Sequence, residues 1–555
     1  MKRTIIMVSL AFMAICANAQ NAYDALMFSE NNYEGTARSM AMGNAFTALG
    51  GDLGGMTINP AGSAVARYSQ FTITPGLTVS TATSQGVPPV AGGILPYFER
   101  EMRSSMTKMS LPNFGLTTYM ETGRKSGLKS MTFGFTVNTT NSWNQDVYAN
   151  GHNERTSFAG ALAAGTSALM ADLNANLPEG EPPYTSDDLT NDDSYDYMPW
   201  RDVVGFNSYI TDLMPGSKDT FIGANELPYD NGDIALGGEI EQTYGRRVTG
   251  SKQEYLFNFG MNISDLIYLG ANLGITNINY NYMDYFKEEA VDQENFRIQY
   301  QDGTSTYWKS LKYNYDYNAQ GTGVFLKAGV ILTPGGGLRI GAAIQTPTTN
   351  TIEEEWQESG QTKYSSSKYD ASASSPLGYG TYTFNSPYRA NFGIAYTMGR
   401  FGVISADYEM CDYGQMKYST YDSDDDYFEE VNMDIKKRFG VSHMLRTGIE
   451  LKPVASVALR AGYGLTTSGE IYDHEGNELG IKPTQNLSFG LGYNSKGSFY
   501  LDAALRTTFR TIEYYYPYDD YLFDNNGNIH PDDLSPEISI IHSAWKALVT
   551  FGWRF

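Results

Sequence analysis

Strict alternation between apolar and polar residues recurs along the whole chain. In one such stretch, Val457, Leu459, Ala461, Tyr463 and Leu465 share one side, and small or charged residues stand between them. The last ten residues, KALVTFGWRF, repeat the pattern. A period of two places each set on one face of a β-strand. The sequence therefore predicts a protein built mainly of strands that have one apolar and aromatic face.

Fourteen such runs can be traced, and several are longer than the strands of soluble sheets usually are. The links after even-numbered runs are short, such as SD at 264–265, whereas those after odd-numbered runs are long and polar. Short turns at one end and long loops at the other are typical of an outer-membrane β-barrel. The predicted strands cover residues 68–83, 110–122, 129–141, 238–263, 266–285, 308–333, 337–356, 377–399, 401–419, 433–452, 455–470, 480–496, 498–516 and 537–555.

The hydropathy of the chain favours a closed sheet over helices as the membrane-crossing element. After the N-terminus, no run approaches about 18 consecutive apolar residues. In lipid every backbone polar group needs a partner, which a closed sheet provides. We therefore predict an all-β fold, a transmembrane outer-membrane β-barrel of about 14 antiparallel strands over 68–555. Phe551, Trp553 and Phe555 share one face of the last strand and are predicted to be its C-terminal assembly signal.

The N-terminus has the features of an export signal. Lys2 and Arg3 precede an apolar run over 5–15 and an Ala-Asn-Ala cleavage site, so residues 1–19 are predicted to be a signal peptide. A lipoprotein signal ending at Cys16 is the alternative, but Ile15 is not the small residue it needs. The net charge of −23 argues against nucleic acid as a partner.

Residues 20–67 precede the first predicted strand and are rich in Gly, Ala, Ser and Met. A barrel of 14 strands leaves a lumen wide enough for water unless something fills it. Small residues allow close packing and sharp turns in such a space. We predict that this segment is a hatch inside the lumen. A disordered periplasmic tail is the alternative, and the low charge of the segment argues against it.

Two motifs in this segment resemble the N-terminal signature of the FadL/TodX-type family of long-chain fatty acid and hydrocarbon transporters. They are GNAFTALGGD at 43–52 and INPAG at 58–62, and LRIGAAIQTPT and FGLGYNSKGSFYLDAAL further along resemble strand pairs of that family. The residues that match the signature, which the resemblance implies position the hatch, are Gly43, Asn44, Ala45, Phe46, Gly50, Asp52, Asn59, Pro60 and Ala61.

The resemblance also implies a mechanism. Extracellular loops catch a hydrophobic ligand, which moves to a pocket near the hatch and leaves sideways through a gap in the wall, without coupling to an energy source. The gap is expected at a kink in an early strand, and Pro112 is a candidate for it.

The long loops contain further candidate sites. The largest loop, about 142–237, has apolar residues at helical spacing that are predicted either to capture ligand or to pack as a cap: Phe158, Leu162, Leu169, Met170 and Leu173. The acidic runs at 421–430 and 519–533 are predicted to be solvated loops, the alternative being divalent cations shared with lipopolysaccharide. We predict no metal site and no cofactor.

Passive uptake of hydrophobic small molecules, such as long-chain fatty acids, is the predicted function. The alternative is a surface-exposed binding or adhesion protein, including haemin binding, with the barrel as an anchor; a general porin is a third possibility. We predict no enzyme, because the sequence contains no GxSxG, HExxH or CxxC motif. The expected partners are a hydrophobic ligand, outer-membrane lipid and lipopolysaccharide, and the barrel assembly machinery, and the protein is expected to be a monomer.

Overall fold

The computed structural model describes residues 21–555 with the exception of 89–96, 192, 229–233, 300–302, 421–424, 473–476, 480–482, 496, 524–528 and 531–532. The predicted signal peptide, 1–19, and parts of both acidic runs lie outside the described residues.

The wall is a single antiparallel sheet in which every strand pairs with its neighbours along the chain. β1 pairs with β2 on one side and with the last strand, β23, on the other, so the sheet closes into a barrel. Three of the crossings are interrupted and carry two labels each. In chain order the crossings are β1 (Gln70–Gly86), β2 (Met102–Glu121), β3 (Leu128–Asn153), β8 (Ile240–Ile263), β9 (Ile267–Ala290), β11 (Ser305–Gly335), β12 and β13 (Leu338–Gln345, Thr349–Tyr364), β15 and β16 (Gly378–Asn385, Arg389–Thr397), β17 and β18 (Gly402–Asp412, Lys417–Ser419), β19 (Val441–Val454), β20 (Val457–Thr466), β21 (Thr484–Asn494), β22 (Phe499–Tyr515) and β23 (Ile538–Arg554).

These fourteen crossings confirm the predicted fold class. The predicted alternation is also present: along β20, Ala458 and Arg460 are buried toward the lumen, whereas Leu459 faces outward. Large apolar side chains on the outer face are half exposed, as a lipid-facing surface requires, among them Phe392, Ile394, Leu445, Phe489 and Leu491. Among the described helices, none is both long and apolar enough to span a membrane.

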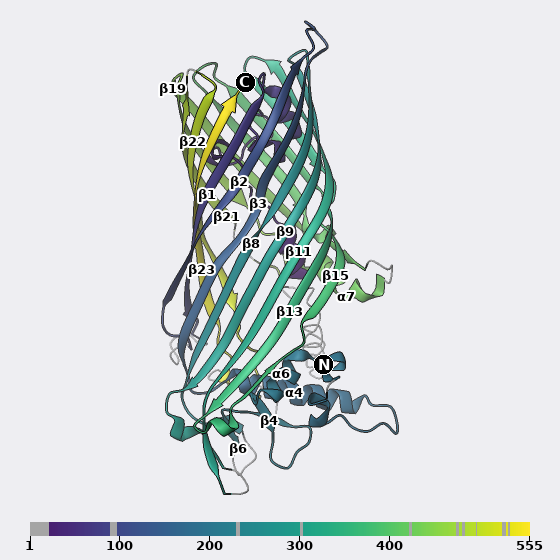
Figure 1. Ribbon diagram of the computed structural model, residues 1–555, viewed down its shortest axis with the longest axis vertical. Helices are drawn as coiled ribbons and strands as arrows, with labels where there is room; N and C mark the ends of the chain where they lie inside the picture. The colour runs from purple at the N-terminus through teal and green to yellow at the C-terminus, as the bar shows by residue number, and fades with distance from the viewer. Residues whose placement is uncertain are drawn as a thin grey trace.

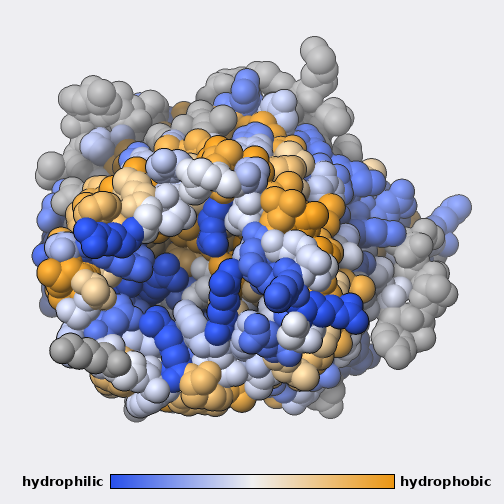
Figure 2. Space-filling view, turned by 90° about the horizontal axis from the view of Figure 1, so that it is seen from above, coloured by the Kyte–Doolittle hydropathy of each residue, from blue (hydrophilic) through white to orange (hydrophobic). Residues whose placement is uncertain are grey.

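The wall is much taller on one side than on the other (Figure 1). β11 has 31 residues, which is roughly 100 Å of extended chain, whereas β20 has 10. In Figure 1 the short turns and the C-terminus lie at the top, and the long loops lie at the bottom. Seen from the end with the short turns, hydrophilic residues surround a central hollow (Figure 2).

The long loops form a separate layer that sits against the tall side of the wall (Figure 1). Between β3 and β8 this layer contains helices and short hairpins: α4 (Phe158–Ala175), η3 (Ser186–Leu189), α5 (Ser194–Tyr197), α6 (Trp200–Asn207), β4 (Thr211–Leu213), β5 (Phe221–Gly223), β6 (Glu226–Pro228) and β7 (Ile234–Leu236). Later loops add η4 (Gln293–Phe296), β10 (Arg297–Gln299), η5 (Ser367–Tyr369), β14 (Ala371–Ser374), η6 (Tyr413–Gln415), η7 (Asp425–Phe428) and α7 (Glu429–Arg438).

Four predicted boundaries are wrong by eight residues or more. β2 begins at Met102 and not at 110, and β13 ends at Tyr364 and not at 356. β3 continues to Asn153, so the largest loop begins about a dozen residues later than the predicted 142, because β8 supplies a backbone partner over the whole extension. Residues 433–438, predicted to begin a strand, belong to helix α7. That helix has Glu429 and Glu430 in its first turn and basic residues in its last, an arrangement that favours a helix through its dipole.

Candidate functional site

Residues 21–67 lie inside the barrel, and we call them the lumenal segment. Two of its helices begin with capping boxes, in which the side chains of Asn21 and Thr36 accept backbone N–H bonds from the first turn. The chain between the helices is buried against inward-facing wall residues. The helices are α2 (Ala22–Ser29), α3 (Ala37–Ala41), and the 3₁₀ helices η1 (Gly54–Thr57) and η2 (Pro60–Val65).

The nine residues that carry the family resemblance all lie in this segment, and all but Gly43 are buried. The Asn59 amide donates to the carbonyls of Thr47 (2.6 Å) and Val330 (3.1 Å), and its oxygen accepts the Ala61 N–H (3.0 Å). The Asp52 carboxylate accepts the Thr36 hydroxyl at 2.7 Å. These contacts join parts of the segment to one another and to β11.

Gly43 shows why one position of the motif needs glycine. Its φ is +63°, and a Cβ atom there would lie 2.8 Å from the Thr447 carbonyl oxygen and 3.0 Å from the Tyr463 nitrogen. Both the left-handed backbone and the wall exclude a side chain. Asn44 follows, also in the left-handed region at φ 59°, and its amide donates to the Tyr33 carbonyl at 2.8 Å.

Cationic side chains of the wall bind backbone carbonyls of the lumenal segment. Lys252 donates to the carbonyls of Phe28 (2.9 Å) and Glu30 (2.5 Å). Four other wall cations each donate to one backbone carbonyl of the segment. They are Arg389 to the carbonyl of Ser29, Arg506 to that of Tyr33 (2.7 Å), Lys327 to that of Thr57 (2.6 Å) and Arg339 to that of Leu49. Five wall cations therefore hold the segment by its backbone, which does not depend on the identity of its side chains.

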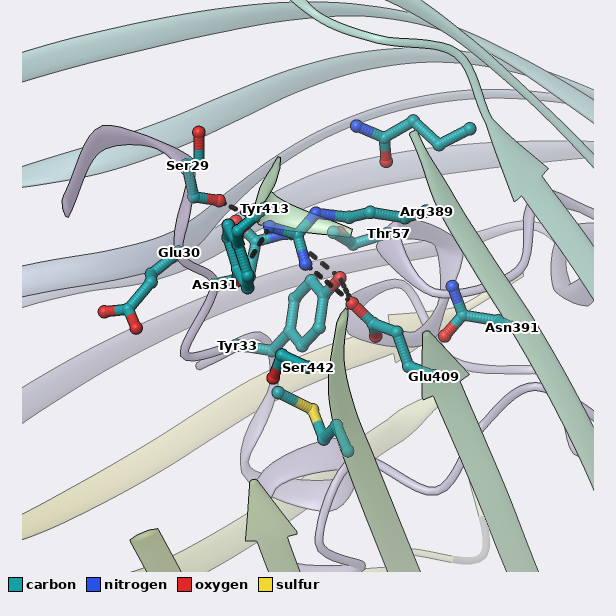
Figure 3. A network of polar contacts seen from close by, with 12 residues as sticks. Ser29, Glu30, Asn31, Tyr33, Thr57, Arg389, Asn391, Glu409, Tyr413 and Ser442 are labelled. Carbon is teal, nitrogen blue, oxygen red and sulfur yellow. Dashed lines mark hydrogen bonds and ion pairs between the residues drawn. The ribbon is translucent and has the colours of Figure 1, made fainter. Parts of the chain in front are cut away.

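Ion pairs and charge-assisted bonds add a second set of contacts. Glu409 accepts from Arg389 (2.9 Å), Arg446 (3.0 Å) and the Tyr33 hydroxyl (3.1 Å), as Figure 3 shows for Arg389 and Tyr33. Asp407 accepts the N–H and the hydroxyl of Thr47, both at 2.7 Å. Other pairs are Arg38 with Glu450 at 2.9 Å, and Lys546 with Glu34. Most of the inward charges thus bind the lumenal segment or one another.

A polar cavity of about 190 Å³ lies between the lumenal segment and the wall. Residues 30–33 of the segment and inward residues of β19 to β22 line it, together with Asn141 of β3. The lining is mostly amide, hydroxyl and guanidinium groups: Asn31, Asn32, Asn44, Asn141, Arg446, Thr466, Thr484, Asn486, Ser488 and Arg506. Met444, Tyr33 and Tyr413 are its large apolar or aromatic side chains. No sequence pattern predicts this cavity, since its residues follow no linear motif.

The backbone pairing of the wall is interrupted beside this cavity, between β2 and β3. The two strands pair over Asn113–Glu121 and Ser130–Asn138 only. Before Asn113, β2 remains paired with β1, and after Asn138, β3 remains paired with β8. Pro112 stands where the β2–β3 pairing ends, opposite a bulge between Thr74 and Gly76 of β1.

Exposure changes at the same place. In the paired part of β2, buried and exposed residues alternate from Asn113 to Thr118, but residues 107–111 are exposed without alternation. Further along, Ser104 of β2 donates its hydroxyl to the Asp146 carbonyl of β3, so the strands meet again there. The interruption is therefore bounded at both ends.

On the lumenal side of the interruption, a short piece of the lumenal segment takes the place of β2. The N–H groups of Asn32 and Glu34 donate to the carbonyls of Thr140 (2.5 Å) and Thr139 (3.0 Å) of β3. The Glu34 carboxylate also accepts the Ser142 hydroxyl at 2.8 Å. We call residues 30–34 the strap. It lines the cavity on one side and binds the edge of β3.

The apolar residues predicted for ligand capture lie on α4 in the loop layer. Phe158, Leu162 and Met170 are buried, and Leu169 and Leu173 are half-buried. The Phe158 ring packs on Phe286 and Tyr313 of the wall at centroid distances of 5.5 and 5.3 Å. This face of α4 thus packs within the loops and against the tall wall, so ligand contact there stays a prediction.

Two carboxyl groups of this loop layer have raised pKa values: Glu226, which is buried, and Asp202, which is half-buried. Glu226 accepts the Gly223 N–H at 2.9 Å and the Tyr521 hydroxyl at 3.0 Å, and burial raises its pKa above the ordinary range. Asp202 accepts the Thr166 hydroxyl at 2.5 Å, and burial raises its pKa as well.

The described part of the chain contains no group of three His, Cys, Asp or Glu side chains that could hold a metal ion. His152 pairs with Glu99, and His542 pairs with Glu513, so both imidazoles already have a carboxylate partner. C-terminal Phe551, Trp553 and Phe555 face outward and are exposed.

Two solved structures have this fold over almost their full length. The P. putida toluene transporter TodX is 12% identical, with 95% of this chain and 99% of that chain covered and a TM-score of 0.50. A Pseudomonas aeruginosa FadL homologue is 9% identical, with 94% and 99% covered and a TM-score of 0.50. No protein-family model and no curated protein matches the sequence. The likeness confirms the predicted resemblance at the level of the fold, that of an outer-membrane β-barrel.

Proposed function

We propose that this protein takes up hydrophobic small molecules passively, through the barrel and then sideways into the membrane. The observation that supports this most is the juxtaposition of three features: the polar cavity, the strap, and the interruption between β2 and β3. Asn141 lines the cavity and lies on the β3 edge that β2 has left. A molecule in the cavity would thus lie beside the strap and beside this edge of β3.

The solved structures of the same fold support the proposal of hydrophobic uptake. One is described as a toluene transporter and the other as a FadL homologue. Their fold alone does not define a substrate, because one fold serves many functions. The site in this chain supplies the specific argument: an anchor for surface loops needs neither a filled lumen nor an interrupted wall.

In this proposal the lumenal segment is the hatch. Its nine motif residues position it, and the wall cations hold its backbone. Passage then requires only the strap to move, since α3, η1 and η2 remain bound elsewhere. The exposed residues Thr107–Leu111 of β2 would form the exit to lipid, and thermal motion of the strap would suffice without an energy source.

The proposal is tested by native mass spectrometry of the full-length protein, extracted from its own membrane in a mild neutral detergent. A co-purifying apolar molecule that is lost when residues 21–34 are deleted supports transport and gives the class of cargo. The deletion variant must remain heat-modifiable on gels, which shows that its barrel is still folded. Protein that is free of such molecules and takes none up when they are supplied would overturn the proposal, and would favour a surface-binding role for the loop layer.

We also propose that Phe551, Trp553 and Phe555 are the signal read by the barrel assembly machinery. Phe555 closes the barrel through two 3.0 Å backbone bonds with Ser69, so its side chain is free for recognition. A Phe555→Ala variant keeps these bonds, and we expect less assembled barrel in the membrane. An unchanged yield of folded protein would refute this role.

A further inference from the structure

On the tall side of the wall, the outward face of β9 and β11 changes from apolar to polar in a single row of the sheet. Along β9 the unbroken run of apolar outward residues ends at Ile275, and along β11, which runs the opposite way, it ends at Val324. These two residues are directly paired, so both strands leave the lipid-facing band together. The next three outward residues of each strand are exposed and polar, and we call them the amide face: Asn277, Asn279 and Asn281 of β9, and Thr322, Gln320 and Asn318 of β11.

The composition of the amide face is not explained by the needs of the sheet. Asparagine is disfavoured in β-strands, yet β9 has it at three successive outward positions. Among the described residues, the six side chains form one hydrogen bond, from the Asn281 amide to the Asn279 side-chain oxygen at 3.0 Å. Exposed protein surfaces normally mix charges of both signs, whereas this one contains none. Its donors and acceptors therefore remain available to a ligand.

The position of the amide face determines what lies beside it. It continues the lipid-facing band on the same two strands, and its three rows extend roughly 20 Å along them. In an outer membrane, the layer just outside the hydrocarbon of the outer leaflet consists of the sugar head groups of glycolipid. β9 continues to Ala290 and β11 begins at Ser305, so both strands pass through this layer and beyond it (Figure 1).

We propose that the amide face binds uncharged sugar residues of the glycolipid in the outer leaflet. Amide and hydroxyl side chains both donate and accept hydrogen bonds, as sugar hydroxyls do. Tyr379 of β15 is 67% exposed and stands in the row of Asn318, with Glu355 of β13 between them. Its ring offers an apolar face on which the C–H side of a sugar ring can pack. This inference depends on the position of the barrel in the membrane and not on the proposed uptake.

The charges around the amide face favour a neutral ligand over the phosphate groups of a lipid. Glu353 and Glu355 of β13 are exposed and directly paired with residues of the face, so they repel anions. The first outward lysines of β9 and β11, Lys287 and Lys312, stand three rows beyond its last row. A phosphate next to the hydrocarbon therefore meets no cationic side chain of these two strands, whereas a sugar hydroxyl meets amides.

The experiment measures binding of a polysaccharide to full-length protein in neutral detergent by calorimetry. The probe is the polysaccharide that mild acid releases from the outer-membrane glycolipid of the source cells, without its lipid anchor. Wild type is expected to bind it equally well in EDTA and at high salt, since salt does not screen hydrogen bonds between neutral groups.

A pair of double variants locates the binding. Asn279→Ala/Gln320→Ala removes two directly paired amides and should weaken binding roughly tenfold, the effect of losing about two neutral hydrogen bonds. The matched control is Gln361→Ala/Ser372→Ala, which removes an exposed and directly paired amide and hydroxyl farther along the same sheet, and it should bind as wild type does.

Footprinting of wild type with hydroxyl radicals keeps the test independent of how the variants fold. The polysaccharide should protect Tyr379 and also Met283, which is 54% exposed one row beyond the amide face. Met433 of α7 and Tyr209 of the loop layer are similarly exposed and should be oxidised at unchanged rates.

Three results would overturn the inference. The first is no binding by wild type, or binding that EDTA abolishes. The second is equal binding by wild type and the folded Asn279→Ala/Gln320→Ala variant, or unprotected Met283 and Tyr379. The third is a wild-type dimer in sedimentation that the same variant abolishes and the polysaccharide does not dissociate, which would assign this face to a second copy of the chain.

Discussion

The backbone N–H of Glu34 donates to the carbonyl of Thr139 at 3.0 Å, and by this bond the lumenal segment takes the position on β3 that β2 has left. A strand edge with unpaired carbonyls is unstable in a membrane wall, because lipid offers no hydrogen bonds. The strap satisfies two of these groups, the carbonyls of Thr139 and Thr140. In the proposed function its removal would expose them to water or ligand in the lumen.

The pair of Glu34 and Lys546 is expected to be the main electrostatic contact that keeps the strap closed. Both side chains are buried, and the Ser142 hydroxyl binds both of them. Glu34→Gln leaves a buried ammonium without its partner, which typically costs about 3–5 kcal/mol. We expect this variant to conduct ions in planar bilayers where wild type does not. The double variant Glu34→Gln/Lys546→Met should conduct less than the single one, and equal leakage from both would contradict this account.

Gly43 is expected to be essential for seating the lumenal segment against the wall. Gly43→Ala adds a Cβ atom to a left-handed residue in contact with the Thr447 and Tyr463 backbone. The strain and the contact together should destabilise the segment by roughly 1–3 kcal/mol. Gly51→Ala is the matched control, because Gly51 also has a positive φ, +73°, but faces open space. Faster hydrogen exchange over residues 37–50 in the first variant than in the second is the predicted result; equal rates would refute it.

Much of this fold follows from local sequence pattern. The fourteen crossings have period-two alternation, and short turns separate them in pairs, so both number and pairing could be predicted. The cavity and the strap could not, since they depend on contacts between residues far apart in the chain. Tyr33 and Arg506, for example, are 473 positions apart. Helix α7 was not predicted for a different reason: its few apolar residues alternate with polar ones, as residues at the end of a strand do.

Packing of α4 can be distinguished from ligand capture by two leucine variants. Leu162 is 5% exposed in the loop core, whereas Leu169 is half-buried on the same helix. Leu162→Ala is expected to loosen the loop layer by about 2–3 kcal/mol, and Leu169→Ala by clearly less. Limited proteolysis of the loop between β3 and β8 measures this. If α4 captures ligand, Leu169→Ala reduces uptake without increasing cleavage.

The loop layer should become less stable as pH rises. Burial raises the pKa of Glu226 and of Asp202, so the folded loops hold these protons more tightly than unfolded loops do. Stability is therefore greatest at low pH and falls as pH increases above the ordinary carboxyl pKa of about 4. Hydrogen exchange of residues 200–228 should be slower at pH 5 than at pH 8, after correction for the intrinsic rate. Glu226→Gln should reduce this difference, and Glu181→Gln, at an exposed position of the same loop, should not.

Blocking the proposed exit between β2 and β3 tests lateral release most directly. Ser110→Cys places a thiol on the exposed part of β2, and Ile394→Cys places one on a paired, lipid-facing part of the wall, while native Cys411 is buried. Each variant is labelled with a bulky maleimide in cells, and uptake of a radiolabelled fatty acid is followed. We predict that labelling at residue 110 reduces uptake several-fold and that labelling at 394 has no effect. Undiminished uptake with residue 110 fully labelled would contradict lateral release at this site.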